Sequence, residues 1–370
     1  MSEGEALLAA VLSNPDDDTP RLVYADWIEE HGQPDRAAFI RTQIEAVRAE
    51  PFSKQARDAE KRANELLNRY RNWKEWTDAI RDHVQIIDFR FERGFVSHVD
   101  VEPGAFLRMA RELFQDHPVQ SLRLVPHTNP DLRAELSPVF ELPCLKQLKK
   151  LAFAPRTEFL YEDYEAMSES AHLGGITELA IRESPFDPPR LEEILTSKRF
   201  PSLAGLDLSD SSHLGPAVSS ALVRACHRDI RRLDVSRVQI TSELWLEIFK
   251  KGCIQSIEEL RLGWSPLPSD TGPLFHINIG WVIPWERLVV LDLSGQRLGD
   301  EGVKEIVGIP ETAALRWLSL ADNWLTHESV RLLTAAKHLR LNYLDLRQNK
   351  LEAHHIARLR ERFPDAEIRG

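Results

Sequence analysis

One short pattern of apolar positions, apolar-x-x-apolar-x-apolar, recurs along the last two thirds of the sequence. Successive copies begin 26 to 31 residues apart. This spacing predicts an internal structural repeat, because self-similarity at a fixed period of about 20 to 50 residues marks repeat architectures. The copies begin at Val119, Leu148, Ile176, Leu203, Ile230, Ile257, Leu288, Leu315 and Leu341.

Each copy of the pattern predicts one strand followed by one helix. The second and third apolar residues lie two apart, as in Leu206 and Leu208, which is the alternation of a strand with one buried face. The residues behind them return to helical spacing, as in Val330 and Leu333 behind the predicted cap Thr326. Because one strand and one helix cannot bury their apolar faces alone, the copies must stack on one another.

These repeats resemble the long leucine-rich repeats of the ribonuclease-inhibitor-like class. The resemblance covers residues 119–370, about nine units, and implies an α/β fold: a right-handed solenoid with a parallel inner sheet and outer helices. Strands lie about 4.8 Å apart and helices about 10 Å apart, so we expect the stack to curve with its strands inside. Asn323 and Asn349 match the turn asparagine of the family, but other residues interrupt the series: Gln296, Ser265, Val238, Ser211 and Ser184.

Residues 51–118 predict an N-terminal cap for the solenoid. Residues 54–82 have the spacing of one long helix, residues 84–101 predict a hairpin around Arg93-Gly94, and a further helix leads into the first repeat. Hairpin and helix together would cover the open edge of the sheet, which repeat proteins must protect. The apolar residues that share one face of the long helix are Leu66, Tyr70, Trp73 and Ile80.

Residues 1–50 predict a small, acidic, all-α domain. Thr19 and Pro20 begin a helix that ends at Gly32, and Pro34 begins another. The stretch resembles the short repeat-companion domain found at the N-terminus of many paralogous bacterial proteins, often before leucine-rich repeats. The resemblance implies a bacterial protein of that type and indicates no reaction. It rests on Asn14, Pro15, Arg21, Leu22, Tyr24, Ala25, Asp26, Trp27, Glu29, Glu30, Gly32, Ala38, Phe39, Ile40 and Gln43.

Charge and cysteine content narrow the class of partner and the compartment. Among 370 residues, Lys and Arg number 47 and Asp and Glu 58, a net charge of −11. Nucleic acid and anionic membranes need clustered Lys and Arg, so we expect neither as a partner. Three cysteines without a C-x-x-C motif predict reduced thiols, and an N-terminus with early glutamates lacks the pattern of a signal peptide. We therefore expect a cytoplasmic protein, and a monomer.

The inner face of the predicted sheet is the best candidate for a functional site. Polar residues that alternate with the buried leucines must point to this face, and exposed Trp and Tyr are typical binding anchors. An acidic groove for a basic partner is one interpretation; the other is that Arg261 offsets the charges of Asp234 and Asp292. The candidate partner-binding residues are Asp207, Asp234, Arg261, Trp264, Asp292, Trp317, Tyr343, Asp345 and Arg347.

The unit that spans residues 257–287 departs from the others. Its prolines and tryptophans exclude a regular helix, so the segment is either a binding loop or a set of aromatic side chains that fills the space of the missing helix.

No sequence motif indicates catalysis. The chain has no zinc-protease, nucleophile-elbow, Walker or dinucleotide-binding motif, and we predict no catalytic residue, no metal site and no cofactor. The sequence therefore favours a non-catalytic scaffold that binds a protein or peptide on the concave face of the repeats. The alternative is a regulator of a small GTPase or another signalling enzyme, because activators of small GTPases also have solenoids of this repeat length.

Overall fold

The computed structural model divides into two compact units, residues 1–176 (unit 1) and 177–370 (unit 2). It describes residues 2–69, 72, 75–77, 86–127, 135–155, 157–183, 188–212, 215–225, 228–240, 247–248, 251–265 and 285–370. Within the described part, no helix combines the length and the apolar character that a membrane span requires.

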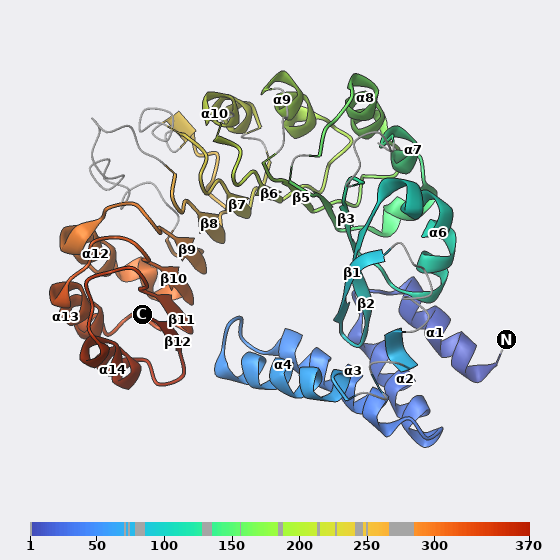
Figure 1. Cartoon of the computed structure of the whole chain (residues 1–370), viewed down its shortest axis with the longest axis horizontal. Coiled ribbons are helices and arrows are strands. Elements are labelled where there is room, and N and C mark those ends of the chain that lie inside the picture. The colour runs from blue at the N-terminus through green and yellow to red at the C-terminus, as the bar shows by residue number, and fades with distance from the viewer. Residues whose placement is uncertain are drawn as a thin grey trace. The chain divides into compact units, whose positions relative to one another are not determined.

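Unit 1 starts with helices and continues with a short sheet (Figure 1). Strand β1 pairs with β2 in antiparallel orientation, and β2, β3 and β4 follow in parallel. The elements are α1 (Glu3–Ser13), α2 (Asp18–Glu30), α3 (Pro34–Arg48), α4 (Lys54–Leu67), β1 (Ile86–Glu92), β2 (Phe95–Val101), α6 (Pro103–Asp116), β3 (Ser121–Leu124), α7 (Ser137–Phe140), the 3-10 helix Pro143–Gln147, β4 (Lys150–Phe153) and α8 (Tyr161–Glu169).

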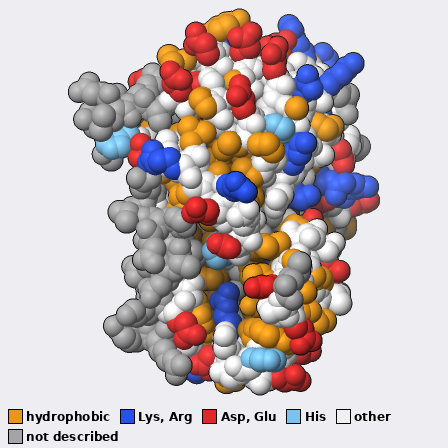
Figure 2. Space-filling model, turned by 90° about the vertical axis from the view of Figure 1, so that its right-hand side faces the viewer, with side chains coloured by type: hydrophobic (Ala, Val, Ile, Leu, Met, Phe, Trp, Pro, Cys, Tyr) orange, Lys and Arg blue, Asp and Glu red, His pale blue; other side chains and the backbone are white. Residues whose placement is uncertain are grey.

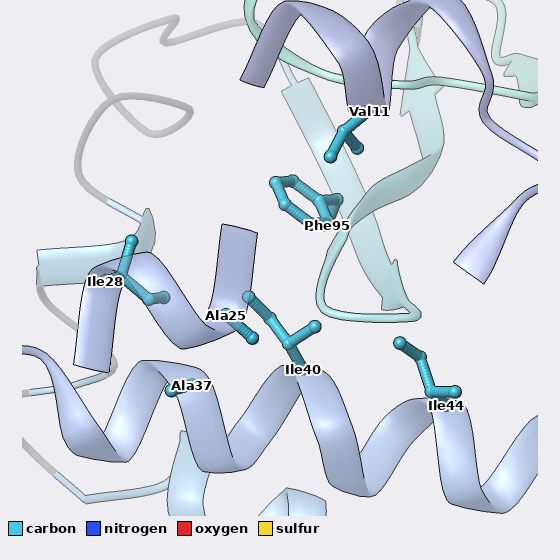
Figure 3. Close-up of a cluster of buried hydrophobic side chains, with 7 residues drawn as sticks. All are labelled: Val11, Ala25, Ile28, Ala37, Ile40, Ile44 and Phe95. Carbon is cyan, nitrogen blue, oxygen red and sulfur yellow. The ribbon is translucent and has the colours of Figure 1, made fainter. Parts of the chain in front are cut away.

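Helices α1 to α3 and the hairpin β1–β2 share one apolar cluster. Figure 3 shows Phe95 of the hairpin among side chains from all three helices. Tyr24 and Trp27 of α2 pack against the cluster, in line with the burial that their i, i+3 spacing favours. The buried members are Val11, Ala25, Ile28, Ala37, Ile40, Ile44 and Phe95.

Two arginines, the buried Arg21 and the half-buried Arg36, join the helices to the tip of the hairpin. Arg21 donates to the carbonyl oxygen of Arg93 at 3.2 Å, and Arg36 donates to that of Gly94. The guanidinium of Arg36 also lies 5.8 Å from the ring centroid of Phe95. Burial lowers the pKa of both arginines to about 10, since neither forms an ion pair within the described part of the chain.

The helix predicted for residues 54–82 is shorter in the structure. Helix α4 ends at Leu67, where the backbone N–H of Asn68 closes the last turn on the carbonyl oxygens of Asn64 and Leu66. Leu66 is half-buried near this end. The other residues expected on its apolar face, Tyr70, Trp73 and Ile80, lie outside the described residues.

Unit 2 is a leucine-rich-repeat-like solenoid, which confirms the α/β class and the parallel sheet. In Figure 1 its strands line the inner side of a curve and its helices the outer side. Its elements are β5 (Glu178–Ile181), α9 (Pro188–Thr196), β6 (Gly205–Asp207), α10 (Gly215–Arg224), β7 (Arg232–Asp234), β8 (Glu259–Arg261), β9 (Val290–Asp292), α12 (Gly299–Val307), the 3-10 helix Pro310–Ala314, β10 (Trp317–Ser319), α13 (His327–Ala335), β11 (Tyr343–Asp345), α14 (Ala353–Arg362) and β12 (Glu367–Arg369).

Strands β5 to β12 pair in parallel, each with the next. The leucine inside each strand from β5 to β11, for example Leu206, Leu260 and Leu318, is buried with at most 2% of its surface exposed. Strand β12 was not predicted, because its only apolar residue is Ile368 and the pattern has no leucine there.

Polar side chains connect the turns that follow the strands. Asn323 accepts hydrogen bonds from the backbone N–H groups of Gln296 and Leu298 and donates to the carbonyl oxygen of Leu293 at 2.8 Å. Asn349 repeats this arrangement one unit later, accepting from the N–H of Asn323. In earlier units a shorter side chain makes a single bond of this kind, such as Ser265 to the carbonyl oxygen of Val235. The interrupted series predicted from the sequence is confirmed.

The prediction that all cysteines are reduced thiols is wrong. Cys253 is disulfide-bonded, whereas Cys144 is free and half-buried. A count of three cysteines without a C-x-x-C motif could not show this bond.

The tip of the hairpin offers a test of how closely unit 1 is packed. Gly94 has a φ of +86°, and a Cβ there would lie 2.8 Å from the Cα of Ile40. We expect Gly94→Ala to lower the free energy of unfolding by about 2–4 kcal/mol, from left-handed strain plus overpacking. Gly32→Ala is the matched control, since Gly32 has the same φ but no atom within 4 Å of its Cβ position; it should cost about 1 kcal/mol. Urea denaturation followed by tryptophan fluorescence measures both, and equal losses would contradict this packing.

Candidate functional site

Most predicted site residues of unit 2 lie in one continuous row across the sheet. The register aligns Asp207 with Asp234, Asp234 with Arg261, and Arg261 with Asp292. The same register then aligns Asp292 with Ser319, Ser319 with Asp345, and Asp345 with Arg369. We call this the central row; it consists of Asp207, Asp234, Arg261, Asp292, Ser319, Asp345 and Arg369. The sequence prediction that these side chains share a face is consistent with this register.

The aspartates of the central row stabilise the turns that follow their strands. Each accepts a hydrogen bond from the backbone N–H two residues later, at 3.1 Å for Asp207, 3.0 Å for Asp234, 2.9 Å for Asp292 and 3.0 Å for Asp345. Such bonds fix the chain as it leaves the strand, because a short carboxylate mimics a backbone acceptor. The presence of aspartate at these positions is therefore explained in part by the turn hydrogen bonds, without any role in binding.

Two of these aspartates are also neutralised by arginines. Arg182 donates from Nε to Oδ2 of Asp207 at 2.6 Å, and Arg347 donates to Asp345 at 2.6 Å. The side chain of Asp345 is only 5% exposed. Asp345 would have to give up this contact to meet a partner, and the row is less acidic than its sequence suggested.

Asp234 is the electrostatically unfavourable member of the row. Burial raises its pKa, and the neighbouring charge of Asp207 raises it further, while the hydrogen bonds from Ser236 and the charge of Arg261 lower it. Like charges on directly opposed positions of neighbouring strands repel. No ion pair of Asp234 occurs among the described residues.

The aromatic pair predicted from the sequence forms an ordered stack. The rings of Trp317 and Tyr343 lie 4.9 Å apart between centroids with 1° between their planes. Arg261 lies 4.8 Å above the Trp317 ring, and Arg369 lies 5.3 Å from the Tyr343 ring. We call these four residues the aromatic stack. All but Arg369, which is exposed, are half-buried.

The two arginines of the aromatic stack differ in their remaining contacts. Arg369 donates to Glu367 at 2.8 Å. The Arg261 side chain makes no hydrogen bond or ion pair within the described part of the chain, so its guanidinium donors are available to another molecule. A guanidinium held flat on a tryptophan keeps its orientation and charge while its edge stays open to an acceptor.

Trp264 lies beside the sheet face and not on it. It occupies the turn after β8 with a φ of +49°, is 39% exposed, and has the Arg237 guanidinium 5.6 Å from its ring. The sequence prediction missed a second exposed tryptophan of this edge, Trp324, which is 57% exposed with a φ of +62°. Its signal was its place directly after the turn residue Asn323.

Residues 266–284 and a recess near strands β6 to β8 add no described residue to the central row. Residues 266–284, most of the irregular unit, lie outside the described residues, and the buried Trp285 follows them. A recess of about 790 Å³ opens at the N-terminal ends of strands β6 to β8. Its charged lining is paired internally, as in the bond of 2.9 Å from Arg231 to Asp229. Within the described ranges, no group of three His, Cys, Asp or Glu side chains is placed to hold a metal ion.

The molecular surface carries charges of both signs. Figure 2 shows acidic and basic side chains interspersed with hydrophobic ones on one face of the molecule. Ion pairs link many of them, for example Arg41 with Asp26 and Glu29 at 2.6 Å each. Mixed charges of this kind produce no extended field of one sign.

Comparison with known proteins supports the fold and little else. No protein-family model matches the sequence, and no curated protein matches it. The crystal structure of the yeast Rad7 and Elc1 complex contains a chain that aligns with a TM-score of 0.51 and 14% identity, over 74% of this chain and 68% of that one. An LRR protein of Leptospira interrogans aligns with a TM-score of 0.25 and 15% identity, over 68% of this chain and 90% of that one. At these identities the first likeness shows the fold alone.

The position of Asp234 predicts a stabilising substitution. Asp234→Asn keeps an acceptor for the Ser236 N–H and removes the repulsion from Asp207, so we expect the free energy of unfolding at pH 7 to rise by about 0.2–1 kcal/mol. The folded state raises the pKa of Asp234, so its ionised form costs stability above that pKa and the cost disappears as the pH falls through it. The difference between the variant and the wild type should therefore shrink in acid.

Asp345→Asn is the control for this measurement. It removes the negative charge of a buried carboxylate that pairs with Arg347, so it should reduce stability. Thermal melts of the three proteins between pH 7 and pH 4 decide the matter. A loss of stability for Asp234→Asn at pH 7 would contradict the assignment of repulsion.

Proposed function

We propose that unit 2 binds a protein or peptide partner on the strand face of its sheet, through the aromatic stack. The observation that carries the proposal is the parallel stack of Trp317 and Tyr343 on neighbouring strands β10 and β11. Unit 2 then acts as a non-catalytic interaction scaffold.

A stacked tryptophan and tyrosine are suited to protein recognition. Both side chains have few rotatable bonds, and the flanking Arg261 and Arg369 hold the rings in place before a partner arrives. A preorganised surface loses little side-chain entropy on binding. Tyr, Trp and Arg are also the residue types that contribute most to protein interfaces.

The surrounding charges favour a partner with a mixed polar surface. Arg261 has unused donors, and Asp234 beside it has a carboxylate without an ion pair in the described residues. A partner that presents both a carboxylate and a basic side chain at this position would satisfy both groups. Charge complementarity of this kind sets the register of a complex more than its affinity.

The alternative of a small-GTPase regulator has no observation in its favour. Such a role needs an Arg or Asn presented to a nucleotide. Of the two arginines considered, Arg182 is held by Asp207 at 2.6 Å, and Arg261, whose donors are open, belongs to the aromatic stack, which suits a protein surface equally well. The structural neighbour from the yeast Rad7 and Elc1 complex occurs in an assembly of proteins, which agrees with a protein partner.

The broader assignments belong to the same proposal. We take residues 1–50 as the helical repeat-companion domain, 51–118 as the cap and 119–370 as the right-handed leucine-rich-repeat solenoid of a cytoplasmic bacterial protein. A monomer without nucleic-acid or membrane partners completes this picture.

Substitutions in the aromatic stack test the proposal. A partner is first isolated by affinity capture on the full-length chain and then purified for titration calorimetry. We expect Trp317→Ala and Tyr343→Ala each to raise the Kd by about 30-fold, equivalent to about 2 kcal/mol for a central interface residue.

Trp324→Ala is the matched control, because Trp324 is exposed but lies on the turn edge. It should leave the Kd within about 2-fold, since peripheral contacts contribute little. Unchanged affinity for both stack variants, or an equal loss for Trp324→Ala, would place the partner elsewhere.

A further inference from the structure

Unit 1 holds a second polar cluster that the proposed function does not use. Strands β2 and β3 place His98 opposite Ser121 and Asp100 opposite Arg123 on one face, while Val99 between them is buried. The four polar side chains make a continuous chain of contacts. We call them the β2–β3 cluster.

The contacts of the cluster connect a serine to a buried carboxylate through a histidine. Nδ1 of His98 lies 2.7 Å from Oγ of Ser121, and Nε2 lies 2.6 Å from Oδ1 of Asp100. The Asp100 side chain is 2% exposed, and Arg123 contacts its other oxygen, Oδ2, at 2.7 Å. The His98 side chain is 16% exposed and Ser121 is half-buried, so both remain accessible from solvent.

Proton counting fixes the roles within this chain. The carboxylate of Asp100, paired with Arg123, only accepts hydrogen bonds, so Nε2 of a neutral His98 must carry the proton. Nδ1 then has a lone pair and accepts the hydroxyl proton of Ser121. This is the connectivity of nucleophile, base and orienting carboxylate in serine hydrolases, with the two imidazole nitrogens exchanged.

We propose that Ser121 is a nucleophile, activated by His98 as general base, and that the β2–β3 cluster accepts acyl groups from carboxylic esters. The inference goes beyond the proposed function, because it concerns another unit and a chemical step. It also explains how a chain without any catalytic sequence motif can contain a reactive site: the residues meet only through strand pairing.

The step balances without a further reactant. Oγ of Ser121 forms a bond to the ester carbonyl carbon as its proton passes to Nδ1 of His98. The carbonyl re-forms as the alkoxide leaves and takes that proton, which yields an acylated Ser121 and an alcohol. Water, activated by the same nitrogen, then releases the carboxylic acid and restores the serine.

Positive charge for the developing oxyanion is present in the cluster. Nε of Arg123 is buried and has no hydrogen-bond acceptor in the described part of the chain. Lys150 of β4 aligns with Ser121 in the next strand and adds a second cation to the same row. The positive charges of Arg123 and Lys150 beside Ser121 favour the negative charge that develops on the carbonyl oxygen during the reaction.

A serine-directed fluorophosphonate probe tests the proposal on the full-length protein. The probe phosphorus is attacked by an activated serine, and mass spectrometry locates the adduct. We expect the adduct at Ser121, and its loss in Ser121→Ala. His98→Gln keeps an amide donor for Asp100 but has no basic nitrogen, and it should slow labelling by about 100-fold or more while circular dichroism shows a retained fold.

Ser236 provides the matched control. It is half-buried like Ser121, its backbone N–H bonds to Asp234, and it has no histidine contact among the described residues. Labelling of Ser121 in preference to Ser236, with Ser236→Ala unchanged, supports an activated nucleophile. Absence of label at Ser121, or an unchanged labelling rate in the folded His98→Gln variant, would show that the cluster is only a cross-strand contact and overturn the proposal.

Discussion

Hydrogen bonds between polar side chains and the turns after the strands fix the strand register of unit 2, and the side-chain rows on its sheet depend on that register. Its strands β6 to β12 have three residues each, too few for the backbone ladder alone to define a register. Asp207, Asp234, Asp292 and Asp345 each hold the turn of their own strand, while Asn323 and Asn349 bridge to neighbouring turns. The side-chain rows follow from this register, because a shift of one residue would turn every row to the other face.

The same register explains what could be predicted from the sequence. The repeat starts, the buried leucines and the adjacency of Trp317 and Tyr343 follow from a period of two within strands and a near-constant spacing between them. Contacts that depend on side-chain length do not follow from that pattern: Arg261 reaches Trp317 across β9, and Arg369 comes from the unpredicted β12. The β2–β3 cluster escaped for a different reason, since His98 belongs to the hairpin and Ser121 to the first repeat.

In unit 1 arginine side chains hold the hairpin against the helices, whereas in unit 2 aspartate side chains hold the turns after the strands. Carbonyl oxygens and aromatic rings surround the buried Arg21 and the half-buried Arg36, and neither has an ion pair among the described residues. A buried charge is costly unless it is well hydrogen-bonded, and removing its acceptor leaves the full cost behind. The carbonyl oxygens of Arg93 and Gly94 can accept only because the hairpin turns sharply there, with a φ of +50° at Arg93 and +86° at Gly94. The hairpin geometry and the helical packing are therefore coupled.

The contrast between engaged and unengaged polar groups separates structural from functional candidates in this molecule. Asp207, Asp345 and Arg347 looked like binding residues in the sequence, but each satisfies a neighbour and would have to give up that contact to meet a partner. Arg261 and the Nε atom of Arg123 have no such acceptor within the described part of the chain. A buried donor without an acceptor costs folding free energy, whereas a half-buried donor such as the Arg261 guanidinium meets water until a ligand supplies an acceptor. The unsatisfied donors therefore point to function more strongly than the aspartates, although the aspartates are the more conspicuous feature of the sequence.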